Sequence, residues 1–133
     1  MHTNRSMPPG VIIPEIPYKD INEAADWLGK AFGFRKRLQI GNHRFQLSFG
    51  DTSVVAIEAT DSSKSYSLMV HVDDVNRFYE QAKAMGAEIV NPPADYPFGE
   101  RQCTVMDIGG HRWTFSQSIA DVDPTTWGGT LYE

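Results

Sequence analysis

The apolar positions in the first half of the chain follow a strand pattern and then a helix pattern. A strand is predicted at 11–16, and its two flanking prolines, which lack backbone donors, place it at the edge of a sheet. Residues 21–32 carry apolar side chains at helical spacing. Asp20 precedes them as an N-cap with Glu23 three residues later, and Gly33 follows as a stop signal. An edge strand followed by a helix is therefore expected.

Three more strands are predicted at 34–40, 44–49 and 53–59. Turn-forming pairs, Gly41-Asn42 and Gly50-Asp51, separate them. In the middle strand apolar and polar side chains alternate, as they do in a half-buried strand. A polar stretch at 60–65 then leads into the second half of the chain.

The second half repeats the pattern of the first. A strand at 66–72 is followed by a helix that Asp74 caps and Gly86 ends. The segment 16–22 matches 70–76 at a constant offset of 54. Further strands are predicted near 87–90, 101–106 and 111–116, with a long loop at 91–99 that contains three prolines.

Two βαβββ modules, about 11–60 and 66–117, therefore account for an α+β domain. A mobile arm is expected at 1–10, because Pro8-Pro9-Gly10 supports neither a helix nor a central strand, and a C-terminal tail at 118–133.

Composition and charge argue against nucleic acid and membranes as partners. The 133 residues, 41% of them hydrophobic, are enough for one domain with a sizeable core. A net charge of −5 without clustered Lys and Arg argues against nucleic acid, and no apolar run is long enough to span a membrane. The single cysteine, Cys103, cannot form an internal disulfide, so a cytoplasmic setting is expected.

Two segments carry a family resemblance. Phe98-Gly99-Glu100-Arg101 followed by Gly109-Gly110-His111-Arg112-Trp113-Thr114-Phe115 resembles the signature of the bleomycin-resistance and glyoxalase-like branch of the vicinal oxygen chelate superfamily, which also contains extradiol dioxygenases. The opening segment 12–34 is similar to the family's first strand and helix. The resemblance implies that the free faces of the two sheets curl into half-barrel clefts, completed across a homodimer in short members.

Alternation along the strands assigns side chains to these clefts, because successive residues leave opposite faces. Trp113 and Phe115 are expected to pack beneath a helix. The side chains expected in the clefts are Ile13, Glu15, Ala56, Glu58, Ser67, Met69, His71, Arg112, Thr114 and Ser116.

The resemblance also implies four metal-ligand positions, which metal-dependent members fill with His, Gln or Glu. Here they read Ile13, Glu58, Ser67 and Thr114, and only Glu58 is a carboxylate. We therefore expect no metal and no other cofactor. A displaced site would need Glu15 and His71 to act as ligands.

Other reactive side chains have simpler interpretations. Cys103 has no basic neighbour except Arg101 and is expected to be a small buried hydrophobe. His43 and His111 are expected to be structural. Arg101 is expected to order the long loop through hydrogen bonds to backbone carbonyls.

The leading hypothesis is a metal-free binding protein of the bleomycin-resistance type, a homodimer that sequesters an amphipathic, cationic or aromatic small molecule. The candidate binding residues are Glu15 and Glu58 for negative charge, His71, Arg112 and Thr114 for polar contacts, and Met69, Phe98 and Trp127 for apolar or stacking contacts. Phe98 and Trp127 have an alternative role in closing the dimer or covering the sheet edge.

The second hypothesis is a glyoxalase-like lyase or isomerase. It would be either metal-dependent with displaced ligands, or metal-free with Glu58 and His71 transferring a proton. A module that binds another protein has no motif to support it.

Overall fold

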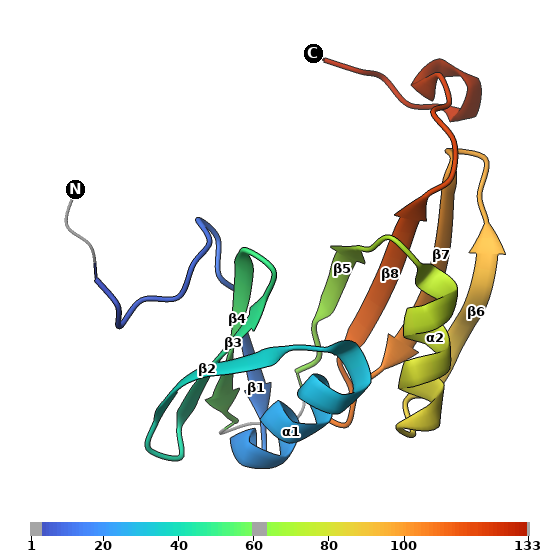
Figure 1. Ribbon diagram of the computed structural model, residues 1–133. Coiled ribbons are helices and arrows are strands. Elements are labelled where there is room, and N and C mark those ends of the chain that lie inside the picture. The colour runs from blue at the N-terminus through green and yellow to red at the C-terminus, as the bar shows by residue number, and fades with distance from the viewer. Residues whose placement is uncertain (1–3, 60–63, 133) are drawn as a thin grey trace. The chain divides into compact units, whose positions relative to one another are not determined.

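The computed structural model describes residues 4–59 and 64–132, and these form two compact units. The first unit runs to Tyr66 and includes the turn 108–110, and the second contains the rest of the chain. Each unit is a four-stranded sheet with one α-helix (Figure 1), and the second unit also has a short 3-10 helix, η1 (Pro124–Trp127), in its C-terminal tail. His2 and most of the predicted linker at 60–65 lie outside the described residues.

The two units have the same topology. The first contains β1 (Glu15–Tyr18), α1 (Ile21–Phe32), β2 (Arg35–Ile40), β3 (Arg44–Phe49) and β4 (Thr52–Glu58), in the sheet order β1-β4-β3-β2. The second contains β5 (Ser67–His71), α2 (Val75–Ala84), β6 (Glu88–Asp95), β7 (Glu100–Met106) and β8 (Arg112–Ser118), in the order β5-β8-β7-β6. In each unit the first strand pairs parallel with the last and the other pairs are antiparallel. The predicted α+β fold of paired βαβββ modules is confirmed.

Two predicted strand boundaries were wrong, both beside prolines. The first strand begins at Glu15, not at 11. The predicted loop at 91–99 is largely strand, because β6 continues through Pro92 and Pro93 with shifts in its register. Both β1 and β6 are edge strands, where a missing N–H costs no ladder bond. The expected edge position of the first strand is confirmed.

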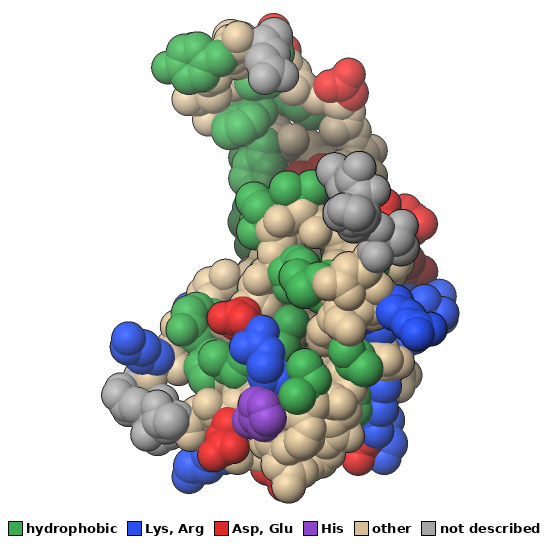
Figure 2. All heavy atoms as spheres, turned by 90° about the vertical axis from the view of Figure 1, so that its left-hand side faces the viewer, with side chains coloured by type: hydrophobic (Ala, Val, Ile, Leu, Met, Phe, Trp, Pro, Cys, Tyr) green, Lys and Arg blue, Asp and Glu red, His purple; other side chains and the backbone are tan. Residues whose placement is uncertain are grey.

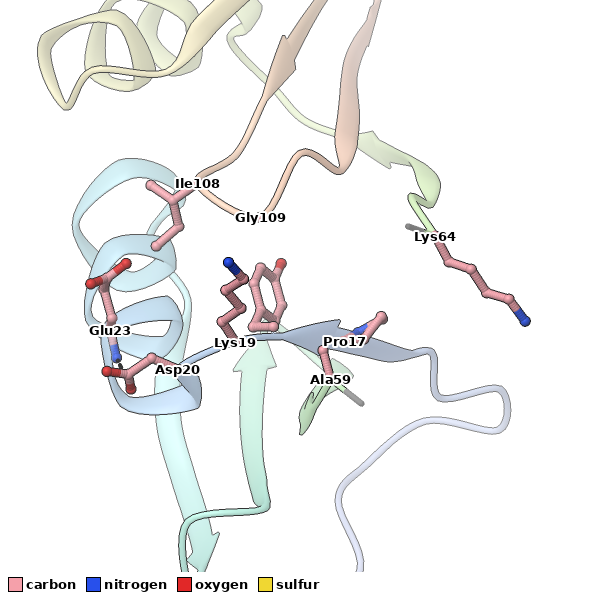
Figure 3. A pocket seen from close by; sticks show the side chains of 9 residues that line it. Pro17, Lys19, Asp20, Glu23, Ala59, Lys64, Ile108 and Gly109 are labelled. Carbon is pink, nitrogen blue, oxygen red and sulfur yellow. Dashed lines mark hydrogen bonds between the residues drawn. The ribbon is translucent and has the colours of Figure 1, made fainter. Parts of the chain in front are cut away.

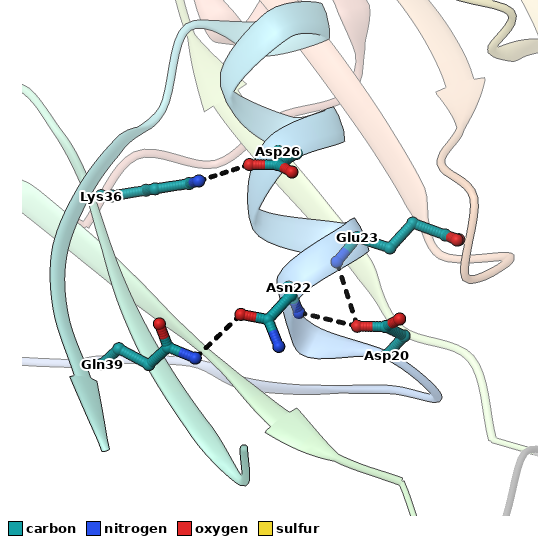
Figure 4. Close-up of polar contacts among 6 residues, drawn as sticks. All are labelled: Asp20, Asn22, Glu23, Asp26, Lys36 and Gln39. Atoms are coloured by element: carbon teal, nitrogen blue, oxygen red, sulfur yellow. Dashed lines mark hydrogen bonds and ion pairs between the residues drawn. The ribbon is translucent and has the colours of Figure 1, made fainter. Parts of the chain in front are cut away.

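Helix α1 begins and ends where the sequence predicts. The Asp20 carboxylate accepts hydrogen bonds from the backbone N–H groups of Asn22 (3.0 Å) and Glu23 (3.1 Å), as Figure 4 shows. Gly33 ends the helix in the left-handed conformation, with φ of 86°. The capped helix buries an apolar stripe consisting of Ile21, Ala24, Ala25, Leu28, Ala31 and Phe32.

Polar pairs hold α1 to strand β2 at the margin of this core. Lys36 forms an ion pair with Asp26, and Gln39 Nε2 donates to Asn22 Oδ1 at 2.8 Å (Figure 4). Lys36 also lies over the ring of Phe45, with Nζ 5.7 Å from its centroid. Lys36 and Phe45 therefore mark the side of the first sheet that faces the helix.

Helix α2 covers one side of the second sheet. Its N-terminal amides are satisfied by the Asp74 carboxylate, which accepts from Arg77 N at 3.2 Å, and by Gln117 Oε1, which accepts from Val75 N at 3.0 Å. The rings of Phe78 and Phe115 stack with centroids 5.0 Å apart. These contacts define the helix side of the second sheet.

The turn at 107–111, just before β8, has a structural role. The buried Asp107 carboxylate accepts from His111 N at 3.0 Å and from Trp113 Nε1 at 2.9 Å. His111 and Trp113 are themselves fully buried. The turn therefore satisfies the polar atoms of a large aromatic core residue, which agrees with the structural role expected for His111.

The distribution of charge on the surface does not indicate a particular class of partner. Basic side chains are interspersed with acidic and apolar ones on the face that Figure 2 presents. Within residues 4–59 and 64–132, none of the helices is both long enough and apolar enough to cross a bilayer.

Gly99 joins the β6–β7 turn to the start of the C-terminal tail. Its φ is 86°, and its carbonyl accepts from the backbone N–H groups of Ile119 (2.8 Å) and Ala120 (3.2 Å). A Cβ atom added at Gly99 would lie 2.2 Å from the Ala120 carbonyl oxygen. Both the backbone conformation and the lack of space therefore require glycine here.

We predict that Gly99→Ala lowers the free energy of unfolding by about 2–4 kcal/mol, from backbone strain and overlap with Ala120 together. Gly110→Ala is the matched control, because Gly110 has a φ of 80° but no atom within 4 Å of an added Cβ. The control should cost only about 1–2 kcal/mol. Equal losses in urea unfolding of the two variants would contradict the proposed overlap.

Candidate functional site

The candidate site is the free face of the second sheet, the side opposite α2. Residues on this face alternate with the buried Trp113, Phe115 and Cys103 on the helix side. The free face of the second sheet includes Ser67, Met69 and His71 on β5, Arg112, Thr114, Ser116 and Ser118 on β8, and Glu100, Gln102, Thr104 and Met106 on β7.

A hydrogen-bond network centred on Glu100 runs across this face. Ser116 Oγ donates to Glu100 Oε1 at 2.7 Å and accepts from Gln102 Nε2 at 3.0 Å. The ring of His71 lies with Nε2 3.2 Å from Ser118 Oγ. Strand register explains this grouping, since Ser116 is paired with His71 on one side and with Gln102 on the other, and Ser118 with Glu100.

The network keeps Glu100 ionised. Hydrogen bonds from the hydroxyls of Ser118 and Ser116 hold the pKa of the Glu100 carboxyl below its ordinary value, and the nearby His71 lowers it further. A half-buried carboxylate on a sheet face can accept charged hydrogen bonds from a bound cation. The face therefore has the chemistry to hold a positively charged group.

Smaller and apolar groups surround the carboxylate. Thr104 and Thr114 share a hydrogen bond of 2.8 Å between their hydroxyls. Met69 is paired in register with Thr114, and 68% of its surface is exposed. The free face of the second sheet thus offers flexible apolar side chains, Met69 and Met106, beside a polar network.

The sequence-predicted residues of the second unit lie as follows. Met69, His71, Arg112 and Thr114 are on the free face, together with Ser67 and Ser116. Phe98 is in the β6–β7 turn. Its ring stacks with that of Tyr96 and lies tilted against that of Trp127, with ring centroids 5.4 Å apart in each pair. A role for these residues in binding stays a prediction.

Sequence reasoning missed the central residue of the network. Glu100 was considered only as part of the family signature, and neither Gln102 nor Thr104 was considered. Alternation along β7 could have predicted their position. Cys103 and Val105 are fully buried on the helix side, so Glu100, Gln102 and Thr104 must face the other way.

In the first unit, the predicted position of Glu58 was wrong. Ala56 pairs with Phe45, on the helix side of the first sheet, and Glu58 leaves the same side two residues later. The register therefore places Ala56 and Glu58 on the side of α1, not in a cleft. Residues 54–57 are all apolar, so alternation gave no indication of which face is which.

Glu15 does lie on the free face of the first sheet, but its charge is compensated. Arg44 Nη2 donates to Glu15 Oε2 at 2.6 Å. Arg101 was predicted to bond backbone carbonyls, and this was wrong: its Nε and Nη2 donate to the Asp95 carboxylate at 2.7 and 3.3 Å. This pair connects β7 to the end of β6, so Arg101 does order the segment that precedes it.

The positions that correspond to metal ligands in the family do not form a donor set. Ile13 precedes β1 and has no donor atom, and Ser67 and Thr114 offer only hydroxyls. Glu15, which a displaced site would need as a ligand, is paired with Arg44. Among the described residues, no three His, Cys, Asp or Glu side chains group closely enough to hold a metal ion.

A pocket of about 240 Å³ lies in the first unit, beside the end of β1 and the start of α1 (Figure 3). Its charged lining residues are Lys19, Asp20, Glu23 and Lys64. The charges are mixed, and Asp20 is already committed to capping α1. The pocket therefore has no group of side chains that would select one kind of ligand, whereas the second sheet has the network around Glu100.

Comparisons with known proteins agree with this fold. A sequence model of the Glyoxalase/Bleomycin resistance protein/Dioxygenase superfamily matches residues 11–115. The crystal structure of TioX from Micromonospora sp. ML1 is 30% identical, with a TM-score of 0.72, over 82% of this chain and 98% of that chain. None of the curated proteins matches the sequence.

Two structures of lower identity share the fold. A bleomycin resistance determinant encoded on the transposon Tn5 is 20% identical, with a TM-score of 0.69, over 84% of this chain and 99% of that chain. TnmS3, an antibiotic binding protein from Streptomyces sp. CB03234, is 21% identical, with a TM-score of 0.67, over 82% of this chain and 95% of that chain.

We predict that the carboxyl of Glu100 titrates below the range of ordinary glutamates and that Ser118→Ala combined with Ser116→Ala raises its pKa. Because the folded-state pKa is depressed, Glu100 stabilises the fold above its unfolded-state pKa, and this contribution is lost as the pH falls through the folded-state pKa. The chemical shift of the Glu100 carboxyl carbon, followed by NMR during a pH titration, measures this pKa in the wild-type protein and in the double variant. Ser67→Ala, on the same face, is the control and should leave the pKa of Glu100 unchanged.

We also predict that Cys103 is unreactive in the folded protein. Burial raises the pKa of its thiol to about 11, so the thiolate fraction at pH 8 is roughly one in a thousand. Alkylation by iodoacetamide should be slow in buffer and fast in denaturant, as read by mass spectrometry. Rapid alkylation of the native protein would contradict the buried position.

Proposed function

Because the chain belongs to the Glyoxalase/Bleomycin resistance protein/Dioxygenase superfamily, we propose that it is a binding protein that sequesters a small amphipathic molecule with a cationic group. The ligand lies on the free face of the second sheet and needs no metal. The observation that carries this proposal is the ionised Glu100 carboxylate, fixed by Ser116 and surrounded by further polar side chains.

The polar network supplies the charged contact. The Glu100 carboxylate already accepts from the hydroxyls of Ser116 and Ser118, and its other acceptor positions can bind a ligand ammonium or guanidinium group. Gln102 and His71 contribute further polar atoms at the flanks. A cation held here exchanges its water for a preorganised acceptor, which reduces the cost of binding.

The apolar part of the ligand has two surfaces to contact. Met69 is exposed on the same face, with a side chain flexible enough to follow an irregular surface. Phe98, whose ring stacks with Tyr96 and lies tilted against Trp127, belongs to an aromatic surface elsewhere in the same unit. Arg112 and Thr114 complete the candidate contact set.

The related structures support an antibiotic-like ligand, because one is named a bleomycin resistance determinant and another an antibiotic binding protein. We further propose a homodimer in the cytoplasm. Exposed Met69, Ile12 and Val11 support a partner surface, and a lone cysteine suits a reducing compartment.

One observation favours an enzyme as the second candidate. His71 and Glu100 are both linked to Ser118, so an imidazole and a carboxylate share one hydroxyl on an accessible face. This pair replaces the Glu58 and His71 pair expected from the sequence. A carboxylate with a depressed pKa is a weak general base at neutral pH, however, so binding is the better-supported function.

The test is a thermal-shift screen of the full chain, followed by calorimetric titration of any stabilising compound. Bleomycin, other cationic glycopeptides, neutral aromatic compounds, Ni²⁺, Zn²⁺ and Mn²⁺ are the probes. A ligand present at a hundred times its Kd adds about 2.7 kcal/mol to the free energy of unfolding, which such a screen detects. Stabilisation by metal ions, with metal bound stoichiometrically, would favour the enzyme instead.

We predict that Glu100→Gln weakens binding of a cationic ligand about 10- to 100-fold, because a charged hydrogen bond is worth about 1.5–3 kcal/mol. Glu80→Gln is the matched control, since it makes the same charge change on the exposed surface of α2 and should leave the affinity unchanged. Equal affinity of the Glu100 variant and the wild-type protein would remove this carboxylate from the site.

A further inference from the structure

The C-terminal tail, residues 119–132, is fixed to the turn between β6 and β7 (Figure 1). The backbone N–H groups of its first two residues, Ile119 and Ala120, donate to the Gly99 carbonyl oxygen at 2.8 and 3.2 Å. Gly99 and Ala120 approach each other so closely that no Cβ atom fits between them. The tail is therefore held to the sheet from the point where β8 ends at Ser118.

A second contact, between two aromatic rings, holds the tail farther along. The tail folds into η1, whose last residue, Trp127, lies against the ring of Phe98 with the centroids 5.4 Å apart. The Asp123 carboxylate caps η1 by accepting from the backbone N–H of Thr125 at 3.0 Å and from its hydroxyl at 2.9 Å. A locally closed turn, and not a free chain end, therefore places the Trp127 ring against Phe98.

Both contacts lie next to the Glu100 carboxylate, the proposed cation site. Phe98 and Gly99 directly precede Glu100, and the turn that contains them closes with a hydrogen bond of 2.8 Å from Tyr96 N to the Glu100 carbonyl oxygen. Ser118, at the root of the tail, is paired in register with Glu100, and its hydroxyl donates to the Glu100 carboxylate. The tail thus contacts the segment that carries the carboxylate and continues from the segment that carries one of its hydroxyl donors.

Ser118 needs this support because it lies at a strand end. In the described sheet it has a ladder partner on β7 but none on β5, which ends at His71, level with Ser116. Strand ends with few neighbours open more readily than the middle of a sheet. A hydrogen bond also weakens steeply when its donor is misaligned. The alignment of the Ser118 hydroxyl with Glu100 therefore depends on what holds the end of β8.

We propose that the C-terminal tail is a positioning element of the cation site, with Trp127 as its main contact residue. By holding the β6–β7 turn and the end of β8 together, the tail keeps the Ser118 hydroxyl directed at the Glu100 carboxylate. The consequence for binding rests on the proposed function, in which this carboxylate accepts the cation. The coupling is reciprocal: the docked tail strengthens binding of the cation, and a bound cation favours the docked tail.

The first experiment loosens the tail and follows the Glu100 carboxyl, and it needs no ligand. Trp127→Ala removes the ring contact with Phe98, and because Trp127 is 43% exposed the sheet should still fold. We expect the pKa of the Glu100 carboxyl, measured from its carboxyl carbon in an NMR pH titration, to rise toward its ordinary value, since the Ser118 donor is then misaligned for part of the time. Trp127→Phe keeps an aromatic ring and should restore most of the difference.

Two controls separate positioning from other effects of a substitution. Tyr132→Ala removes an aromatic side chain of the same tail that is 94% exposed. Gly110→Ala strains the turn before β8, at the opposite end of that strand from Ser118. Both variants should keep the wild-type pKa of Glu100. An unchanged pKa in Trp127→Ala, or an equal rise in either control, would overturn the proposal.

The second experiment is a double-mutant cycle that measures the affinity for bleomycin by calorimetry. Trp127→Ala should weaken binding at least about fivefold in the wild-type protein and much less in the Glu100→Gln protein, where no carboxylate remains to be positioned. Equal losses in the two backgrounds would show that Trp127 acts on the ligand without Glu100, and would overturn the positioning role. Wild-type protein that does not bind bleomycin but shows the pKa response would contradict the proposed ligand while supporting the role of the tail.

Discussion

Parallel pairing of the first strand with the last strand is the constraint on which each unit depends. A parallel pair needs a crossover, and α1 and α2 each begin the path that returns the chain to its partner strand. The helix covers one side of its sheet, and the buried apolar side chains of the two central strands lie beneath it. The other side is left without a helix among the described residues, and it is on these free faces that polar side chains gather.

The two units have corresponding strand registers, but the helix-free sides of their sheets are occupied differently. In the second unit, Glu100, Ser116 and Gln102 satisfy one another across two strands and leave acceptor atoms available. In the first unit, the corresponding side is occupied by the arm through Arg37 and Gln46. One topology thus supports an accessible polar face and a covered one, and local side chains decide between them.

Membership of the superfamily establishes the fold but leaves the function to the site, because one fold serves many chemistries. In this chain the positions that hold metal in other members read Ile13, Glu58, Ser67 and Thr114, and the register turns Glu58 to the helix side. The acid that does lie on a free face is Glu100, whose pKa is lowered by its hydroxyl donors. A carboxylate that stays ionised suits cation binding better than proton abstraction.

Local sequence signals determined the helices, their caps, the repeated modules and the faces of β5 and β8. These features depend on residues close in sequence, and alternation is clear where Trp113 and Phe115 flank Thr114. Only the tertiary structure decided the side on which Glu58 lies, the extension of β6 through its prolines, and the Glu100 network. Each of these depends on which strands are neighbours and in what register, and register brings together residues that no local period relates.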